Sequence, residues 1–147
     1  MVPNSNDNKL TIQRYYGELW NQWHFDLIPQ LLSPTIRFRG SLGTEVSGHA
    51  GFRAYMKTVR AAFPDFENVI DEIVSDRNKV VVRLTYHGTH SGPLFGFPAT
   101  GRKVEYAGVA IFGFKGGQID EGWVLGDLAM LGRQIGLLPP DWPNTSS

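Results

Sequence analysis

The spacing of apolar residues in the first half of the chain predicts three helices. Residues 9–23, KLTIQRYYGELWNQW, carry large apolar side chains at the spacing that places them on one helical face. A short second helix is expected over residues 25–32, FDLIPQLL, where Pro29 lies near the first turn, a position that tolerates proline. A third is expected over residues 48–63, with Ser47 as N-cap and Pro64 after its end. The apolar stripes of the first and third helices are Ile12, Tyr16, Leu19, Trp20 and Trp23, and Phe52, Met56, Val59 and Phe63.

The rest of the chain reads mainly as strands. Residues 35–40, TIRFRG, already alternate apolar and polar side chains, and four further strand-like segments follow Pro64 at residues 65–75, 79–90, 103–115 and 118–126. The short DRN and GG connections suit tight hairpins, and Gly116-Gly117 suits a turn with positive φ. Helices followed by a run of antiparallel strands predict the α+β class. A last helix is expected after Asp127, ending at Gly136.

One connection is unusual for a loop. Residues 91–101, SGPLFGFPATG, are rich in Gly and Pro but also carry Leu94, Phe95 and Phe97. Loops normally run over the surface, so these apolar side chains need cover. The segment is expected to be a lid over a pocket, a subunit contact, or a segment packed on the sheet, and the sequence leaves the three open.

Composition restricts the class of protein. The chain has 147 residues, of which 41% are hydrophobic, so we expect one domain spanning residues 1–147, with its folded part at about 8–138. Fourteen basic residues balance fourteen acidic ones, which gives no reason to expect nucleic acid or an anionic membrane as partner. There is no cysteine, and no signal peptide or membrane-spanning stretch is recognisable. A cytoplasmic location is therefore expected.

Asp127 is an acid in apolar surroundings, within EGWVLGDLAML. One interpretation is an N-cap of the last helix, although the sequence lacks the Glu or Gln at position 130 and the apolar residue at 126 that often accompany a cap. The other is a pocket acid, because strand alternation places Asp127 on the same face as Trp123 and Leu125. A helix N-terminus lowers the pKa of a carboxyl, whereas apolar burial raises it. The residues alone leave the two interpretations open.

The chain resembles the SnoaL-like polyketide cyclases of the NTF2-like superfamily over about residues 15–136. The resemblance lies in FPD, GTHSG, PATGRKVEYAGVAIF, GGQIDEGW and the ending D-L-x-x-L-x-R-Q-I-G. It implies a cone, in which a curved antiparallel sheet wraps around N-terminal helices and encloses an apolar pocket, and a homodimer paired through the outer face of the sheet. It also implies cofactor-free chemistry: a carboxylate removes a proton beside a carbonyl, and the enolate closes a ring in an intramolecular aldol reaction. By position, the family's acid/base aspartate corresponds to Asp127.

Further pocket residues follow from the pattern and the resemblance together. Tyr16 is the preferred hydrogen-bond donor, and Trp123 would be both core and pocket wall if its face is concave. His90 is the histidine expected to reach a substrate, whereas His87 and His90 would point to opposite faces and could not share a metal ion. Arg37 and Arg39 would hold an enolate oxygen on a concave face and would be ordinary surface residues on a convex one. The expected substrate-binding set is Tyr16, Trp20, Phe38, Phe63, His90, Tyr106 and Trp123.

Three functions are compatible with these residues. The first is a cyclase-type enzyme, without metal or organic cofactor, acting on a small apolar or aromatic carbonyl-bearing molecule. The second is a non-catalytic protein that encloses such a ligand, which the scarcity of polar groups on the predicted strands favours. The third is an epoxide hydrolase or dehydratase-type enzyme on the same scaffold; Asp127 with Arg83 or Arg39 would supply part of its Asp-Arg-Asp arrangement, but no other aspartate is a convincing partner. A steroid isomerase mechanism is disfavoured because TIRFRG has no carboxylate.

Overall fold

The computed structural model describes residues 5–144, in which helices precede most of a single sheet. None of the helices in this part of the chain is long and apolar enough to cross a membrane. The helical elements are α1 (Ser5–Arg14), the π-helix η1 (Tyr15–Trp20), the 3-10 turn η2 (Phe25–Leu27), α2 (Ile28–Leu31), α3 (Gly48–Ala62) and α4 (Leu128–Ile135). The strands are β1 (Leu32–Arg39), β2 (Glu45–Ser47), β3 (Glu67–Asp76), β4 (Lys79–Thr89), β5 (Lys103–Lys115) and β6 (Gln118–Gly126).

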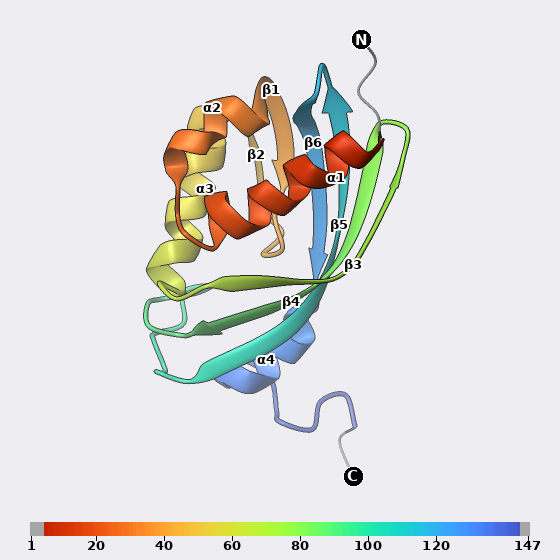
Figure 1. Ribbon diagram of the computed structural model, residues 1–147. Coiled ribbons are helices and arrows are strands. Elements are labelled where there is room, and N and C mark those ends of the chain that lie inside the picture. The colour runs from red at the N-terminus through yellow and green to blue at the C-terminus, as the bar shows by residue number, and fades with distance from the viewer. Residues whose placement is uncertain (1–4, 145–147) are drawn as a thin grey trace.

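The six strands form one curved sheet in the order β2-β1-β6-β5-β4-β3. The helices α1 and α3 lie against its concave face, and α4 packs near the end of β5 (Figure 1). The predicted α+β cone is therefore confirmed. The sheet is mixed, however, because β1 and β6 pair in parallel while the other neighbours are antiparallel. β1 ends at Arg39 and β6 begins at Gln118, so this parallel pair joins segments that are distant in the sequence, which local patterns do not report.

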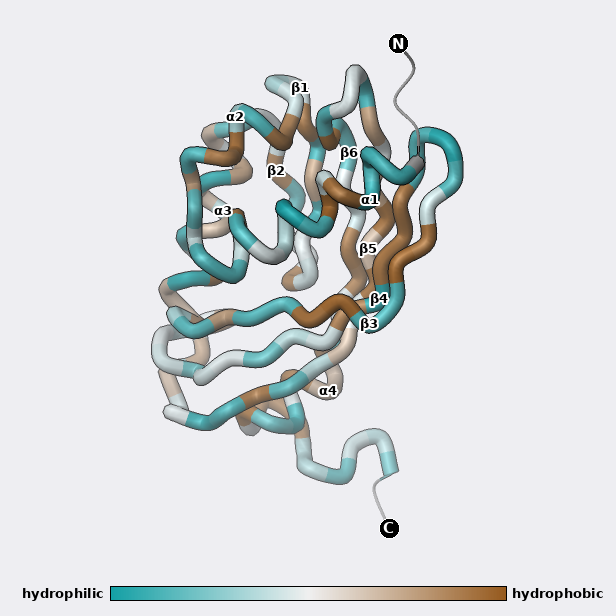
Figure 2. The backbone as a smooth tube through the Cα atoms, viewed as in Figure 1, coloured by the Kyte–Doolittle hydropathy of each residue, from teal (hydrophilic) through white to brown (hydrophobic). Residues whose placement is uncertain are grey.

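The two faces of the sheet differ in polarity. In β4 and β5 every second residue is buried, as expected for strands with one face on a core. Hydrophobic stretches, interrupted by hydrophilic residues, lie along β3, β4 and β5 (Figure 2). The inward side chains meet those of α1, η1 and α3 in one core, so the concave face is where an internal site can form.

Several inward positions on the strands are glycines that aromatic rings cover. A Cβ on Gly108 would lie 2.4 Å from Cε2 of Tyr86, and one on Gly122 would lie 2.7 Å from Cδ1 of Phe38. A Cβ on Gly40, just after β1, would lie 2.1 Å from the Tyr55 hydroxyl oxygen. The rings therefore rest directly on strand backbone, and glycine is required because any side chain would occupy the space of the ring.

The first helical segment changes geometry halfway along. After α1, residues Tyr15–Trp20 form a π-helix, and Asn21 N–H donates to the Tyr16 carbonyl, five residues earlier, at 2.9 Å. Its buried side chains are Tyr15, Tyr16, Leu19 and Trp20. The wider turn thus points two consecutive tyrosines toward the core. Such π-helical turns are rare and are frequently found at functional sites.

We expect Gly108→Ala to destabilise the protein by about 1–3 kcal/mol, because the new methyl group would displace the Tyr86 ring. Gly113→Ala is the matched control on the same strand, since its nearest neighbour would be the flexible Lys79 ammonium group at 3.4 Å. Urea unfolding of both variants measures the difference. Equal effects at the two positions would contradict a specific contact between ring and backbone.

Candidate functional site

The concave side of the sheet encloses a small cavity, which we call the chamber. Its volume of about 20 Å³ is enough for about one water molecule. The wall comes from η1, α3, the inner face of the sheet and the connections that follow β1 and α3. Its lining residues are Tyr15, Tyr16, Trp20, Phe38, Ser41, Tyr55, Val59, Phe66, Asn68, Tyr86 and Val124.

Tyrosine hydroxyls dominate the polar chemistry around the chamber. All five tyrosines of the chain are buried, and four of them line the chamber. The hydroxyl of the fifth, Tyr106, lies 3.5 Å from Ser41 Oγ, and Leu42 N–H donates to the Tyr55 hydroxyl oxygen at 3.4 Å. Among the described residues, none forms a hydrogen bond with the hydroxyl of Tyr16 or Tyr86. These two phenols can therefore donate to a guest in the chamber.

The chamber is uncharged. None of its described lining residues is Asp, Glu, Lys, Arg or His. Burial raises the pKa of Tyr16 and Tyr86 well above the ordinary value of a phenol, so both stay protonated near neutral pH. Burial likewise raises the pKa of Tyr15, Tyr55 and Tyr106. The wall thus supplies neutral hydrogen-bond donors and no group that would take a proton from carbon.

Asp127 lies outside the chamber, at the start of α4. Its side chain is exposed, and its Oδ1 accepts a hydrogen bond from Met130 N–H at 3.0 Å. This is the N-cap arrangement that the sequence left open as one of two interpretations. The expected placement at a pocket floor does not match the structure, because β6 turns Trp123, Leu125 and Asp127 to the outer face.

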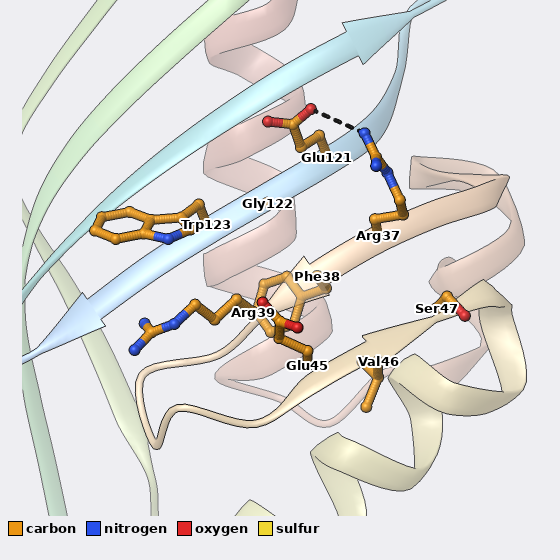
Figure 3. A pocket seen from close by; sticks show the side chains of 9 residues that line it. All are labelled: Arg37, Phe38, Arg39, Glu45, Val46, Ser47, Glu121, Gly122 and Trp123. Carbon is orange, nitrogen blue, oxygen red and sulfur yellow. Dashed lines mark ion pairs between the residues drawn. The ribbon is translucent and has the colours of Figure 1, made fainter.

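The outer face of β1 and β6 also carries Trp123 and the two arginines (Figure 3). Trp123 is 41% exposed and does not line the chamber; together with Arg37, Arg39 and Glu121 it lines a separate pocket of about 500 Å³ on this outer face. The Arg39 guanidinium lies 5.4 Å from the Trp123 ring centroid and donates to the Val124 carbonyl oxygen. Arg37 pairs with Glu121 at 3.6 Å. Both arginines are therefore surface residues, as expected for a convex face.

Of the other expected binding residues, three line the chamber and three do not. Tyr16, Trp20 and Phe38 are in its wall. Phe63 and Tyr106 are fully buried beside it, where Phe63 packs against Phe66 and Tyr106 against Tyr86. The sixth, His90, is buried at the base of the loop and is not among the lining residues.

The His90 side chain joins the two ends of the loop of residues 91–101, and the backbone of Ser91 and Gly92 joins this loop to the end of α3. His90 Nδ1 accepts from Thr100 N–H at 3.3 Å and contacts the Thr100 hydroxyl at 2.9 Å, which places the ring proton on Nε2. Burial lowers the pKa of His90, so the neutral form that makes these bonds is favoured. Ser91 and Gly92 N–H groups both donate to the Ala62 carbonyl, at 2.9 and 3.2 Å. The loop is thus bonded to the end of α3, a contact that was not among the three expected possibilities, and none of its residues lines the chamber.

Sequence reasoning did not identify the remaining lining residues as site residues. Tyr55, Tyr86 and Phe66 resemble ordinary core residues, and Ser41 and Asn68 resemble turn and strand residues. One signal was available: Tyr86 continues the inward series of Val80, Val82 and Leu84 on β4. No group of three or more His, Cys, Asp or Glu side chains in residues 5–144 is arranged to hold a metal ion.

Comparison with known proteins shows the family. A sequence profile of the SnoaL-like polyketide cyclase family matches residues 10–135. A protein from Jannaschia sp. CCS1, assigned to the SnoaL-like polyketide cyclases, has a crystal structure similar to this one, with a TM-score of 0.85 and 25% identity over 95% of this chain and 98% of that chain. None of the curated proteins matches the chain in sequence. The chain belongs to the SnoaL-like polyketide cyclase family.

Two structures from Streptomyces extend the comparison. AclR from Streptomyces galilaeus, assigned as a hydroxylase, gives a TM-score of 0.81 at 28% identity and covers 96% of this chain and 87% of its own. IdmH from Streptomyces antibioticus, assigned as a polyketide cyclase, gives a TM-score of 0.76 at 26% identity, and the match covers 88% of this chain and 98% of the IdmH chain. Proteins assigned to different reactions thus share this scaffold, and the reaction must be argued from the site.

Substitutions at Asp127 separate its capping role from its charge. We expect Asp127→Ala to lower the free energy of unfolding by about 1 kcal/mol, and Asp127→Asn to change it by only a few tenths, because Asn caps helices about as well as Asp. Urea unfolding near neutral pH checks both values. A loss in Asp127→Asn as large as in Asp127→Ala would show that the negative charge, and not the cap hydrogen bond, is what stabilises the fold.

Proposed function

We propose that the chamber binds a neutral, apolar, carbonyl-bearing molecule and polarises its carbonyl group. The observation that carries this proposal is the pair of buried phenols, Tyr16 and Tyr86, whose hydroxyls have no partner among the described residues. A carbonyl oxygen is the acceptor that such donors lack. The aromatic wall around them suits the rings of a planar, apolar ligand.

The uncharged lining of the chamber indicates that its ligand is also uncharged. A carboxylate buried without a cation would lose its hydration with nothing to replace it, which is far more costly than burying a neutral carbonyl. The described lining residues supply no such cation. An uncharged ketone, quinone or ester therefore fits the chamber, and a free acid does not.

In the cyclase-type reaction, the phenols would act on the oxygen of the carbonyl group. When a proton leaves the adjacent carbon, negative charge develops on that oxygen, and preorganised donors in a dry site lower the energy of this state. The phenols supply that stabilisation. They do not supply the base, so the chamber alone accounts for binding and carbonyl activation rather than for the complete aldol ring closure.

A second candidate function places acid/base chemistry on Asp127. Within residues 5–144, only Met130 N–H bonds to this carboxylate, at Oδ1, and the carboxylate borders an apolar depression of about 450 Å³ on the outer face. Arg83 lies on the same depression and could hold an enolate oxygen. In this alternative the substrate would bind outside the chamber, between Leu125 and Leu128, on a surface that includes Val109 and Leu125 and that the dimer proposed below would cover.

We also propose that the protein is a homodimer paired through the outer face of the sheet. Val81, Ile111 and Trp123 lie opposite one another on neighbouring strands and form an exposed apolar row, and Val109 and Leu125 form a second row beside it. Charged residues of both signs border the rows, including Arg83, Glu121 and Arg37. A second copy would cover the apolar rows and place opposite charges near one another.

Fluorescence titration with prodan, 6-propionyl-2-(dimethylamino)naphthalene, tests the chamber as the binding site. This probe is neutral, apolar and carbonyl-bearing. We expect Tyr86→Phe to weaken its binding about fivefold, the size of one neutral hydrogen bond, without loss of stability, because the deleted hydroxyl has no partner in the free protein. The double variant Tyr16→Phe/Tyr86→Phe should bind more weakly still.

Two matched probes and one variant make this test decisive. The parent 2-(dimethylamino)naphthalene, which lacks the carbonyl, should bind wild type and Tyr86→Phe equally, and anionic 6-(dimethylamino)-2-naphthoate should bind poorly to both. If prodan binds wild type, Tyr86→Phe and the double variant with the same affinity, the proposal is wrong. Exchange of the probe's propionyl α-protons in D2O, followed by NMR, tests the second candidate: exchange that the protein accelerates and Asp127→Asn abolishes would support acid/base chemistry at that residue.

The dimer is tested by Ile111→Glu, a charge placed in the middle of the apolar row. We expect the dissociation constant of the dimer to rise roughly 100-fold, because an unpaired charge would be buried at the interface. Sedimentation equilibrium measures the change. Leu10→Glu, an equally drastic change at an exposed leucine on α1, is the control and should leave the dimer intact. A wild-type protein that sediments as a monomer would refute the dimer.

A further inference from the structure

The closed chamber is too small for the ligand it is proposed to bind. Its volume is about 20 Å³, whereas ligand pockets in proteins typically measure about 300–1,000 Å³. A molecule of the class named above can enter only if part of the wall moves. This inference rests on the proposed function, and it concerns which part of the wall moves and what holds it closed.

Two of the three main walls are firmly held. The inward rings of Phe38 and Tyr86 rest on Gly122 and Gly108 within a continuous strand ladder. The helix α3 is a regular α-helix of 15 residues, and its last carbonyls are bonded by Phe63 N–H and by the loop that follows β4. Movement of either wall would break strand pairing or helix packing.

The third wall, η1, is irregular and carries three of the lining side chains. Tyr15, Tyr16 and Trp20 all project from this one π-helical stretch into the chamber. The chain then reverses at Trp23, which has φ +56°. A bulky side chain in the left-handed region is uncommon and strained, so it persists only where surrounding contacts impose it.

The contacts that impose this reversal connect the segment to the edge of the sheet. The Asn21 side chain donates to the Asn68 carbonyl at 3.0 Å and accepts from both the backbone N–H and the side-chain amide of Asn68, at 2.8 and 3.0 Å. Because β3 is the last strand of the sheet, the Asn21 amide takes the place of a further strand there. Trp23 adds a hydrogen bond from its indole N–H to the Pro64 carbonyl at 3.1 Å and a contact with the Arg60 guanidinium.

We propose that residues 15–25 are the gate of the chamber, and that the Asn21–Asn68 pair is the latch that holds it shut. When Asn21 releases Asn68, the strained turn at Trp23 relaxes and η1 carries Tyr16 and Trp20 away from the strands. Asn68 is itself a lining residue, so its amide faces both the latch and the ligand. A ligand oxygen that accepts a hydrogen bond from the Asn68 side-chain amide competes with the Asn21 side-chain oxygen for this donor. Ligand binding in the chamber therefore favours the open gate.

Stopped-flow association of prodan tests the gate in the full-length protein. We expect Asn21→Ala to speed association about tenfold, the effect of losing the hydrogen bonds of one half-buried amide in the closed state. Gln22→Ala is the matched control: the neighbouring amide bonds only to the Gly17 carbonyl within the segment, at 3.1 Å, and does not reach the sheet. Trp23→Phe, which deletes the bond to Pro64 and keeps a ring, should accelerate association to a smaller extent.

Amide hydrogen exchange of the ligand-free variants tests the gate without prodan. The gate is supported if amide exchange in Asn21→Ala is faster only in residues 15–25 and Gln22→Ala exchanges like wild type. This holds even if prodan does not bind, in which case only the proposed ligand is wrong. A second outcome would overturn the gate and leave the proposed function standing. In it, prodan binds, its association rate is the same in wild type and Asn21→Ala, and amide hydrogen exchange of residues 15–25 is unchanged. Faster exchange throughout the molecule would identify Asn21 as a general stabilising residue and would also overturn the gate.

Discussion

The pairing register of β5 with β6 is the constraint on which the chamber depends. It places Gly108 opposite Gly126 and Phe112 opposite Gly122, so the concave face carries bare backbone at neighbouring positions. The Tyr86 ring from β4 and the Phe38 ring from β1 then rest on that backbone, and Tyr86 lines the chamber together with the tyrosines of η1 and α3. A shift by one residue would turn the glycines outward and the exposed Ile111 and Trp123 inward, and the ring positions would be lost.

The same register determines the chemistry of the site. On β6 the inward position beside the tyrosines is Val124, whereas Trp123, Leu125 and Asp127 point outward. The chamber therefore contains hydrogen-bond donors but no side chain that could act as a base. A buried donor without a partner is unfavourable in the empty protein, and this cost is removed when a ligand oxygen arrives, so the phenols favour ligands that accept hydrogen bonds. Chemistry that also needs a base must take it from elsewhere.

Local patterns predicted most elements and left two features open. The bounds of β5 and β6 agree with the expected segments because a Gly-Gly turn separates two alternating runs. The three residues of β2 are too few for a pattern, and the parallel pairing of β1 with β6 joins distant segments. Alternation correctly placed Trp123 and Asp127 on one face but did not say which face was concave. Glu121, two residues before Trp123, was the informative residue, since a charged side chain indicates the solvent side of a sheet.

Closure gives the hydrogen bonds of the chamber their strength. In an enclosed aromatic wall, water does not compete for the phenols, and a donor in such surroundings interacts more strongly with a carbonyl oxygen than it would in solvent. A permanently open chamber would lose that advantage, and a permanently closed one would admit no ligand. An irregular helix fastened to a sheet edge by one side-chain amide meets both requirements, because its opening breaks the Asn21–Asn68 hydrogen bonds and the ring contacts of Tyr16 and Trp20 while the strand pairing of the sheet stays intact.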